Sequence, residues 1–92
     1  MIVSFGDRDT ERLSQGIRVK RFSAFERPAL RKLRQLQVAG DLQDLRIPPG
    51  NHLEKLSGNL EGLWSIRIND QFRICFEWTA AGPAGVTIVD YH

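Results

Sequence analysis

The chain has 92 residues, the length of one small domain with a single hydrophobic core. Hydrophobic residues make up 41% of the chain and charged residues 26%, which excludes an intrinsically disordered protein. One cysteine, Cys75, excludes an internal disulfide and a cysteine-based zinc site, and we expect no metal ion and no other cofactor. No apolar run approaches the roughly 20 residues of a membrane span, and the N-terminus lacks the pattern of a signal peptide. We therefore expect a cytoplasmic protein without membrane contact.

The first half of the chain predicts a short strand and two helices. Residues 2–5 are apolar enough for a strand, Asp7 is expected to cap a helix that Gly16 ends, and residues 17–22 predict an extended basic connector. Ser23 and Glu26 have the spacing of a capping box, which would open a helix that continues to about residue 39. Pro28 favours a start nearer residue 27, because proline is tolerated only in the first turn.

The second of these helices has a stripe of apolar residues at helical spacing, which predicts that this face packs on the core. The stripe consists of Phe25, Ala29, Leu33 and Leu36, with Leu30 beside it.

The second half of the chain predicts strands. A helical turn at residues 41–45 and a turn at residues 48–51 lead to a short strand at residues 52–56. Two further strands follow at residues 64–68 and 72–78, then a loop at residues 80–85 and a last strand at residues 86–92. This order predicts one α+β domain over residues 1–92, with two N-terminal helices on one face of an antiparallel sheet of three to five strands.

The hairpin WSIRINDQFRICFEW, residues 64–78, contains one arginine in each strand. A three-residue loop at residues 69–71 keeps the apolar faces of both strands together, because a slip of one residue would exchange the faces. This register places Arg67 directly opposite Arg73, on the face away from Trp64 and Phe76. Two interpretations are open: the arginines are ordinary solvated residues balanced by nearby acids, or they bind a polyanion such as a phosphodiester.

Positive charge is concentrated in residues 18–34, although the net charge of the chain is only +2. This segment contains one acid, Glu26, and seven basic residues: Arg18, Lys20, Arg21, Arg27, Arg31, Lys32 and Arg34. Such a segment either attracts a polyanion or an acidic protein surface, or is a solvated helix face.

Three titratable side chains end the chain at Asp90, Tyr91 and His92. Histidine and aspartate can transfer protons, and tyrosine can stack on a base. The alternative is a frayed tail whose polar groups are simply hydrated. His52 has no other histidine near it in the sequence and lies between a turn and a strand, where we expect an ordinary surface residue.

Three stretches together resemble a known family: the start MIVSF, the run LRIPPGNHLEKLSGNLEG together with the hairpin WSIRINDQFRICFEW that it leads into, and the closing IVDYH. They are similar to the HigB-type toxins of bacterial toxin–antitoxin pairs, in the RelE/ParE superfamily. The resemblance implies a RelE-like fold and a ribosome-dependent endoribonuclease that cuts messenger RNA. It also implies a HigA-type antitoxin with a helix-turn-helix domain, through which the complex binds operator DNA.

The resemblance also implies site residues. The strand arginine of the family falls on Arg73, and its C-terminal triplet falls on Asp90, Tyr91 and His92. Some relatives have a histidine and a lysine where this chain has Glu54 and Ser57, with His52 and Lys55 nearby as further RNA-binding candidates.

For RNA cleavage we assign phosphate stabilisation to Arg73 with support from Arg67, proton transfer to Asp90 or His92, and base positioning to Tyr91. The alternatives are a non-catalytic ParE-like inhibitor of DNA gyrase and a small RNA- or protein-binding module.

Overall fold

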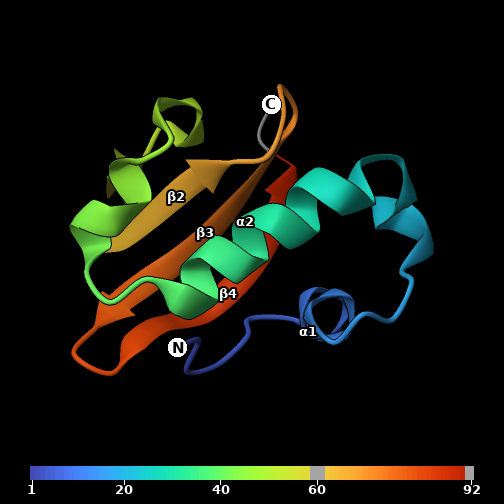
Figure 1. The fold of residues 1–92 in the computed structure, drawn as a ribbon, viewed down its shortest axis with the longest axis horizontal. Coiled ribbons are helices and arrows are strands. Elements are labelled where there is room, and N and C mark those ends of the chain that lie inside the picture. Colours follow the sequence, from blue (N-terminus) through green and yellow to red (C-terminus); the bar gives the residue numbers. More distant parts are fainter. Residues whose placement is uncertain (59–61, 91–92) are drawn as a thin grey trace.

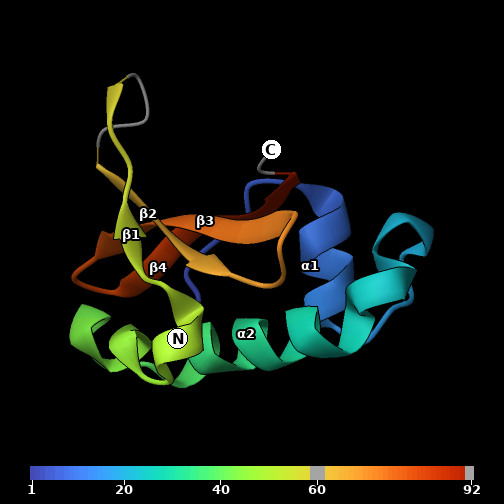
Figure 2. The same ribbon diagram turned by 90° about the horizontal axis from the view of Figure 1, so that it is seen from above.

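A four-stranded antiparallel sheet forms the centre of the structure, a computed structural model that describes residues 1–58 and 62–90. Its strands lie in chain order as β1 (Glu54–Lys55), β2 (Leu63–Arg67), β3 (Phe72–Thr79) and β4 (Gly82–Asp90). The helices α1 (Arg8–Ser14) and α2 (Glu26–Val38) precede the sheet in the chain, and α2 runs across one of its faces (Figures 1 and 2). The predicted α+β class is confirmed.

Helix α1 begins and ends as the sequence predicts. The side chain of Asp7 caps it by accepting a hydrogen bond from the backbone N–H of Thr10 at 3.0 Å. Gly16 lies just beyond its end with φ +84°, a conformation that glycine adopts without the strain of a Cβ atom.

The predicted capping box of α2 is wrong. The helix begins at Glu26, and Phe25 occupies the cap position without a side-chain hydrogen bond. A start at Ser23 would place Pro28 beyond the first turn, where its missing N–H would break the helical ladder; a start at Glu26 keeps it inside that turn. Residues upstream instead form the 3₁₀ helix η1 (Lys20–Phe25), so the predicted extended connector is shorter than expected.

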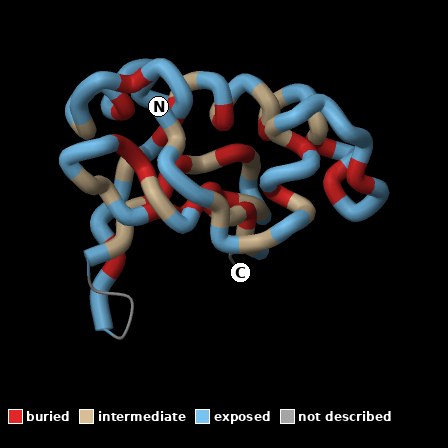
Figure 3. The backbone as a smooth tube through the Cα atoms, turned by 90° about the horizontal axis from the view of Figure 1, so that it is seen from below, coloured by how far each residue is buried: buried red, intermediate tan, exposed pale blue. Residues whose placement is uncertain are grey.

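The apolar stripe of α2 packs on the sheet, as predicted. Ala29 and Leu36 are fully buried, and the ring of Phe25 stacks on that of Phe72 in β3 with 4.2 Å between centroids. Leu30 is partly buried beside this cluster. Buried positions recur along both the helical and the strand segments (Figure 3), because each element turns one side toward the shared core.

The chain between α2 and the sheet is short and irregular. The predicted helical turn is the 3₁₀ helix η2 (Leu42–Arg46), and a second 3₁₀ helix, η3 (Pro49–Asn51), follows it. The strand expected at residues 52–56 is reduced to the two residues of β1. It cannot begin at His52, because this residue has the left-handed conformation, with φ +44°.

The β2–β3 register is the predicted one. Trp64 pairs with Phe76, Ile66 with Ile74, and Arg67 with Arg73. The backbone N–H of Ile68 donates to the carbonyl of Phe72 at 2.9 Å, which closes the hairpin around the three-residue loop.

The loop predicted at residues 80–85 is wrong, because β4 already begins at Gly82 and pairs with β3 from there. Glycine, alanine and proline have low strand propensity, but residues 3–6 cover the outer edge of β4 and stabilise it. The N–H of Val3 donates to Pro83 O at 2.7 Å, and Val86 N–H donates to Ser4 O at 3.1 Å. The strand expected at residues 2–5 is therefore a bridge, Phe5 to Val86, parallel to β4.

Candidate functional site

Arg73 is a buried arginine whose guanidinium binds the protein itself. Its relative exposure is 8%. The Nε–H donates to Ser65 Oγ at 2.8 Å, and Nη2 donates to the carbonyl oxygens of His52 and Ser65. One planar fork thus joins the segment before β1 to β2 and β3, which fixes the orientation of the positive charge.

Glu54 is the carboxylate next to this guanidinium. Its Oε2 lies 3.9 Å from Nη2 of Arg73, and its side chain is 54% exposed. Glu54 pairs with Ser65, whereas Lys55 pairs with Trp64, so alternation along the strand puts Glu54 and not Lys55 on the arginine side. His52 meets Arg73 through its backbone carbonyl, and the residue itself is exposed.

Arg67 lies opposite Arg73 but has a different environment. Its Nη2 donates to Oδ1 of Asp70 in the hairpin loop, and its side chain is 36% exposed. The two like charges are therefore tolerated as neighbours because each has its own acceptors.

Asp90 is the last residue of β4 and pairs with Phe72, whereas Arg73 pairs with Val89. Alternation therefore puts the Asp90 and Arg73 side chains on opposite faces of the sheet, at the same end of the β3–β4 ladder. Oδ2 of Asp90 accepts a hydrogen bond from Nε2 of Gln71 at 3.1 Å. Tyr91 and His92, the other two predicted residues of this site, lie outside the described residues.

The basic segment 18–34 does not form one uniform patch. Arg21 makes ion pairs with Asp9 at 2.8 Å and Asp7 at 3.4 Å, and Arg18 lies 3.6 Å from Glu26. Lys32 donates to Oδ1 of Asn51 at 2.5 Å. Its partial burial, together with Arg31 and Arg67 nearby, lowers its pKa.

The other four basic residues of the segment are exposed: Lys20, Arg27, Arg31 and Arg34. Arg31 and Arg34 line a cavity of about 470 Å³ on α2 together with Leu30, Gln35 and Val38.

Cys75 lies on the arginine side of the sheet, paired with Ser65 and Thr87, and is buried. Burial raises the pKa of its thiol, and the positive charge of Arg73 offsets this only in part. The thiol is therefore a poor nucleophile.

Comparison with known proteins identifies the family. The family model described as "RelE-like toxin of type II toxin-antitoxin system HigB" matches residues 5–92. Toxin HigB-1 of Vibrio cholerae serotype O1 is 42% identical over an alignment of 94 residues, which spans all of this chain and 98% of that toxin. An uncharacterized protein of Haemophilus influenzae is 40% identical over 48 residues, covering 52% of this chain and 48% of that protein. The chain belongs to the HigB-like toxin family.

The similarity to HigB-type toxins that the sequence indicated is thus confirmed, and the fold of this HigB-like toxin agrees with a RelE-like arrangement. Within residues 1–58 and 62–90, no group of three or more histidine, cysteine, aspartate or glutamate side chains could bind a metal ion. In the same residues no helix is long and apolar enough to cross a membrane.

Ser65 was not predicted as a site residue, and Glu54 was named only as a departure from some relatives, yet in the described part of the chain both side chains lie next to the buried guanidinium of this HigB-like toxin. Serine and glutamate are common on the polar face of a strand, so their sequence positions alone do not indicate contact with a buried arginine. The signal that could have found Ser65 is its register: it shares a strand face with Arg67 and lies diagonally across from Arg73.

Proposed function

We propose that this HigB-like toxin is a ribosome-dependent endoribonuclease that cleaves messenger RNA and is neutralised by a HigA-type helix-turn-helix antitoxin. The observation that supports this best is the opposition of Arg67 and Arg73 at the end of the β2–β3 ladder, where β4 ends at Asp90. Cleavage of a phosphodiester needs positive charge at the phosphate and a group able to transfer protons. The two arginines supply the charge on one face of the sheet, and Asp90 lies at the same end of the strands on the other face.

In the proposed reaction the 2′-oxygen of a ribose attacks the adjacent phosphorus, and the bond from phosphorus to the 5′-oxygen breaks. The 2′-hydroxyl gives its proton to a base, and the leaving 5′-oxygen receives one from an acid. The products are a 2′,3′-cyclic phosphate and a 5′-hydroxyl. Asp90 and His92 are the proposed proton-transfer groups, and Tyr91 is proposed to stack on a base.

Arg73 is proposed to stabilise the negative charge that grows on the phosphate. Its bonds to Ser65 and His52 fix the guanidinium before RNA arrives, so little reorganisation is needed in the transition state. Arg67 is more exposed and is proposed to bind a neighbouring phosphate, exchanging its contact with Asp70 for the RNA. His52 and Lys55, both exposed at the adjacent edge, are proposed as further RNA contacts.

The exposed basic residues Lys20, Arg27, Arg31 and Arg34 are proposed to attract either ribosomal RNA or an acidic surface of the antitoxin. In this proposal, operator DNA is bound only through the toxin–antitoxin complex.

The test is to incubate the purified toxin with translating ribosomes and map the ends of the mRNA. Wild type should cut, whereas Arg73→Ala and a variant lacking His92 should cut about 10²–10³-fold more slowly. Arg12→Ala, which removes an exposed arginine of α1, is the charge-matched control and should cut like wild type.

Equal cutting by the wild type and both site variants would overturn the assigned residues. Absence of cutting together with arrested supercoiling by DNA gyrase would overturn the nuclease proposal in favour of a gyrase inhibitor.

A further inference from the structure

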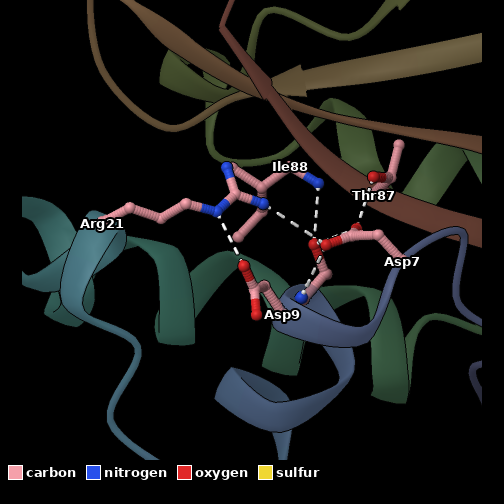
Figure 4. A network of polar contacts seen from close by, with 6 residues as sticks. Asp7, Asp9, Arg21, Thr87 and Ile88 are labelled. Carbon is pink, nitrogen blue, oxygen red and sulfur yellow. Dashed lines mark hydrogen bonds and ion pairs between the residues drawn. The ribbon is translucent and has the colours of Figure 1, made fainter.

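A network of hydrogen bonds joins the start of α1 to β4, about 80 residues further along the chain (Figure 4). Oδ1 of Asp7 accepts from the hydroxyl of Thr10 at 2.6 Å and from that of Thr87 at 2.5 Å. Oδ2 accepts from the backbone N–H of Thr10 at 3.0 Å and from Nη2 of Arg21 at 3.4 Å. One carboxylate therefore connects the loop before α1, the helix itself and the last strand.

Thr10 extends this network to the strand backbone. Thr10 is fully buried, and its Oγ1 accepts a hydrogen bond from the backbone N–H of Ile88 at 3.0 Å. The same hydroxyl donates to Asp7, so the position of the strand amide and that of the carboxylate are coupled.

These side-chain contacts begin where the backbone hydrogen bonds to the outer edge of β4 end. From Pro83 to Val86 the outer edge of β4 is paired with the backbone of residues 3–6. The chain then turns into α1 at Arg8. From that point the edge amide of Ile88 binds a side chain instead of a neighbouring strand, and Asp90 follows two residues later.

We infer that Asp7, Thr10 and Thr87 are positioning residues that set the end of β4, and with it Asp90, for the reaction. This inference rests on the proposed endoribonuclease function. Proton transfer needs the acid or base within hydrogen-bond reach of the substrate, and a misplacement of about 1 Å can cost about 10²-fold in rate. None of the three residues needs to touch RNA for this role.

The test uses Thr87→Val, which keeps the shape of the side chain and removes one hydroxyl. The matched control is Thr79→Val at the other end of the β3–β4 hairpin, where the Thr79 hydroxyl donates to Gly82 O at 2.7 Å. Both changes remove one hydroxyl from the same hairpin. The control is the more severe of the two, because the Thr79 hydroxyl also accepts a hydrogen bond from the backbone N–H of Ala81 at 3.2 Å.

Thr87→Val should lower kcat for ribosome-bound mRNA about tenfold, with KM within about twofold of wild type, whereas Thr79→Val should leave kcat unchanged. Thr87→Ser restores the hydroxyl and should restore kcat. Equal kcat for Thr87→Val and Thr79→Val, or no rescue by Thr87→Ser, would overturn the inference.

A second readout separates this inference from the proposed function. The amide NMR signals of Val89 and Asp90 should shift or broaden in Thr87→Val and stay in place in Thr79→Val. If wild type does not cut mRNA, the nuclease proposal fails, and the amide signals alone decide whether the network positions the strand end. Unchanged signals in Thr87→Val would reject the positioning role.

Discussion

Arg67 and Arg73 face each other across β2 and β3, yet their guanidinium groups bind different acceptors. Arg73 is buried against Ser65 and the carbonyl of His52, whereas Arg67 reaches outward to Asp70. The pair therefore consists of one fixed charge and one accessible charge. Removing Arg73 is therefore expected to cost much more stability than removing Arg67.

Removing Arg73 should destabilise the fold. Arg73→Ala leaves the hydroxyl of Ser65 and the carbonyl of His52 without their donor, and we expect a loss of about 2–4 kcal/mol in the free energy of unfolding. Urea denaturation of wild type and Arg73→Ala measures this difference in the free energy of unfolding. An unchanged midpoint would show that water replaces the guanidinium at no cost.

Ser65→Ala separates positioning of Arg73 from its charge. It removes the acceptor of the Nε–H and keeps the arginine, so we expect about 1 kcal/mol of destabilisation and a loss of cleavage smaller than that of Arg73→Ala. Urea denaturation and mRNA end mapping on the same samples measure both effects.

Removing Arg67 should change stability little. Its ion pair with Asp70 is partly exposed, and its removal also relieves repulsion from Arg73, so Arg67→Ala should stay within about 1 kcal/mol of wild type. The measurement is the same urea titration at low and high salt. A loss as large as that of Arg73→Ala would contradict the distinction between the two arginines.

The stability of the fold should fall at acidic pH through Asp7. Partial burial alone would raise the pKa of Asp7, but hydrogen bonds from Thr10 and Thr87 and the charge of Arg21 outweigh it, so the pKa lies below its usual value. Because folding lowers this pKa, the ionised carboxylate stabilises the fold above its unfolded pKa, and this contribution is lost as pH falls through the folded pKa.

Asp7→Asn should therefore be less stable than wild type near neutral pH, and its stability should depend less on pH below about pH 4. Denaturation midpoints from about pH 6 to about pH 2 test this. Glu77→Gln, which neutralises an exposed carboxylate of β3, is the charge-matched control. Parallel pH curves for Asp7→Asn and wild type would contradict the role of the carboxylate.

Cys75 should react slowly with thiol reagents in the folded protein. It is 7% exposed, and burial raises the pKa of its thiol, so both access and thiolate content are low. Reaction with a chromogenic disulfide reagent should accelerate strongly in urea. Fast reaction without denaturant would indicate that the sheet opens locally.

Gly82 should not tolerate a side chain. It has φ +129°, and a Cβ atom there would lie 2.2 Å from the carbonyl oxygen of Met1. Gly82→Ala should therefore cost more than about 1 kcal/mol in unfolding free energy. Gly50→Ala, where no atom lies within 4 Å of the added Cβ, is the control and should be close to neutral.

Local patterns were enough for much of this fold. Apolar spacing along residues 25–36 identified the core face of α2, and Asp7 and Gly16 marked the ends of α1. Alternation in the hairpin determined its register, because a one-residue slip would have moved isoleucines onto the arginine face. The same alternation predicted that Arg67 and Arg73 are neighbours.

Other features depended on residues far apart in the chain. Residues 80–85 have the composition of a loop, and β4 includes most of them because residues 3–6 cover its edge. The buried guanidinium of Arg73 binds the carbonyl oxygen of His52, which lies 21 residues earlier in the chain.

The amino-acid sequence by itself determined the strand register and the two opposed arginines, because these follow from periodicity and local turn geometry, and the resemblance of its motifs to HigB-type toxins indicated the family. Only the tertiary structure decided which arginine is buried and how α1 holds β4 through Asp7, Thr10 and Thr87. Such contacts join residues about 80 positions apart, and no local pattern specifies the acceptor that a buried donor will find.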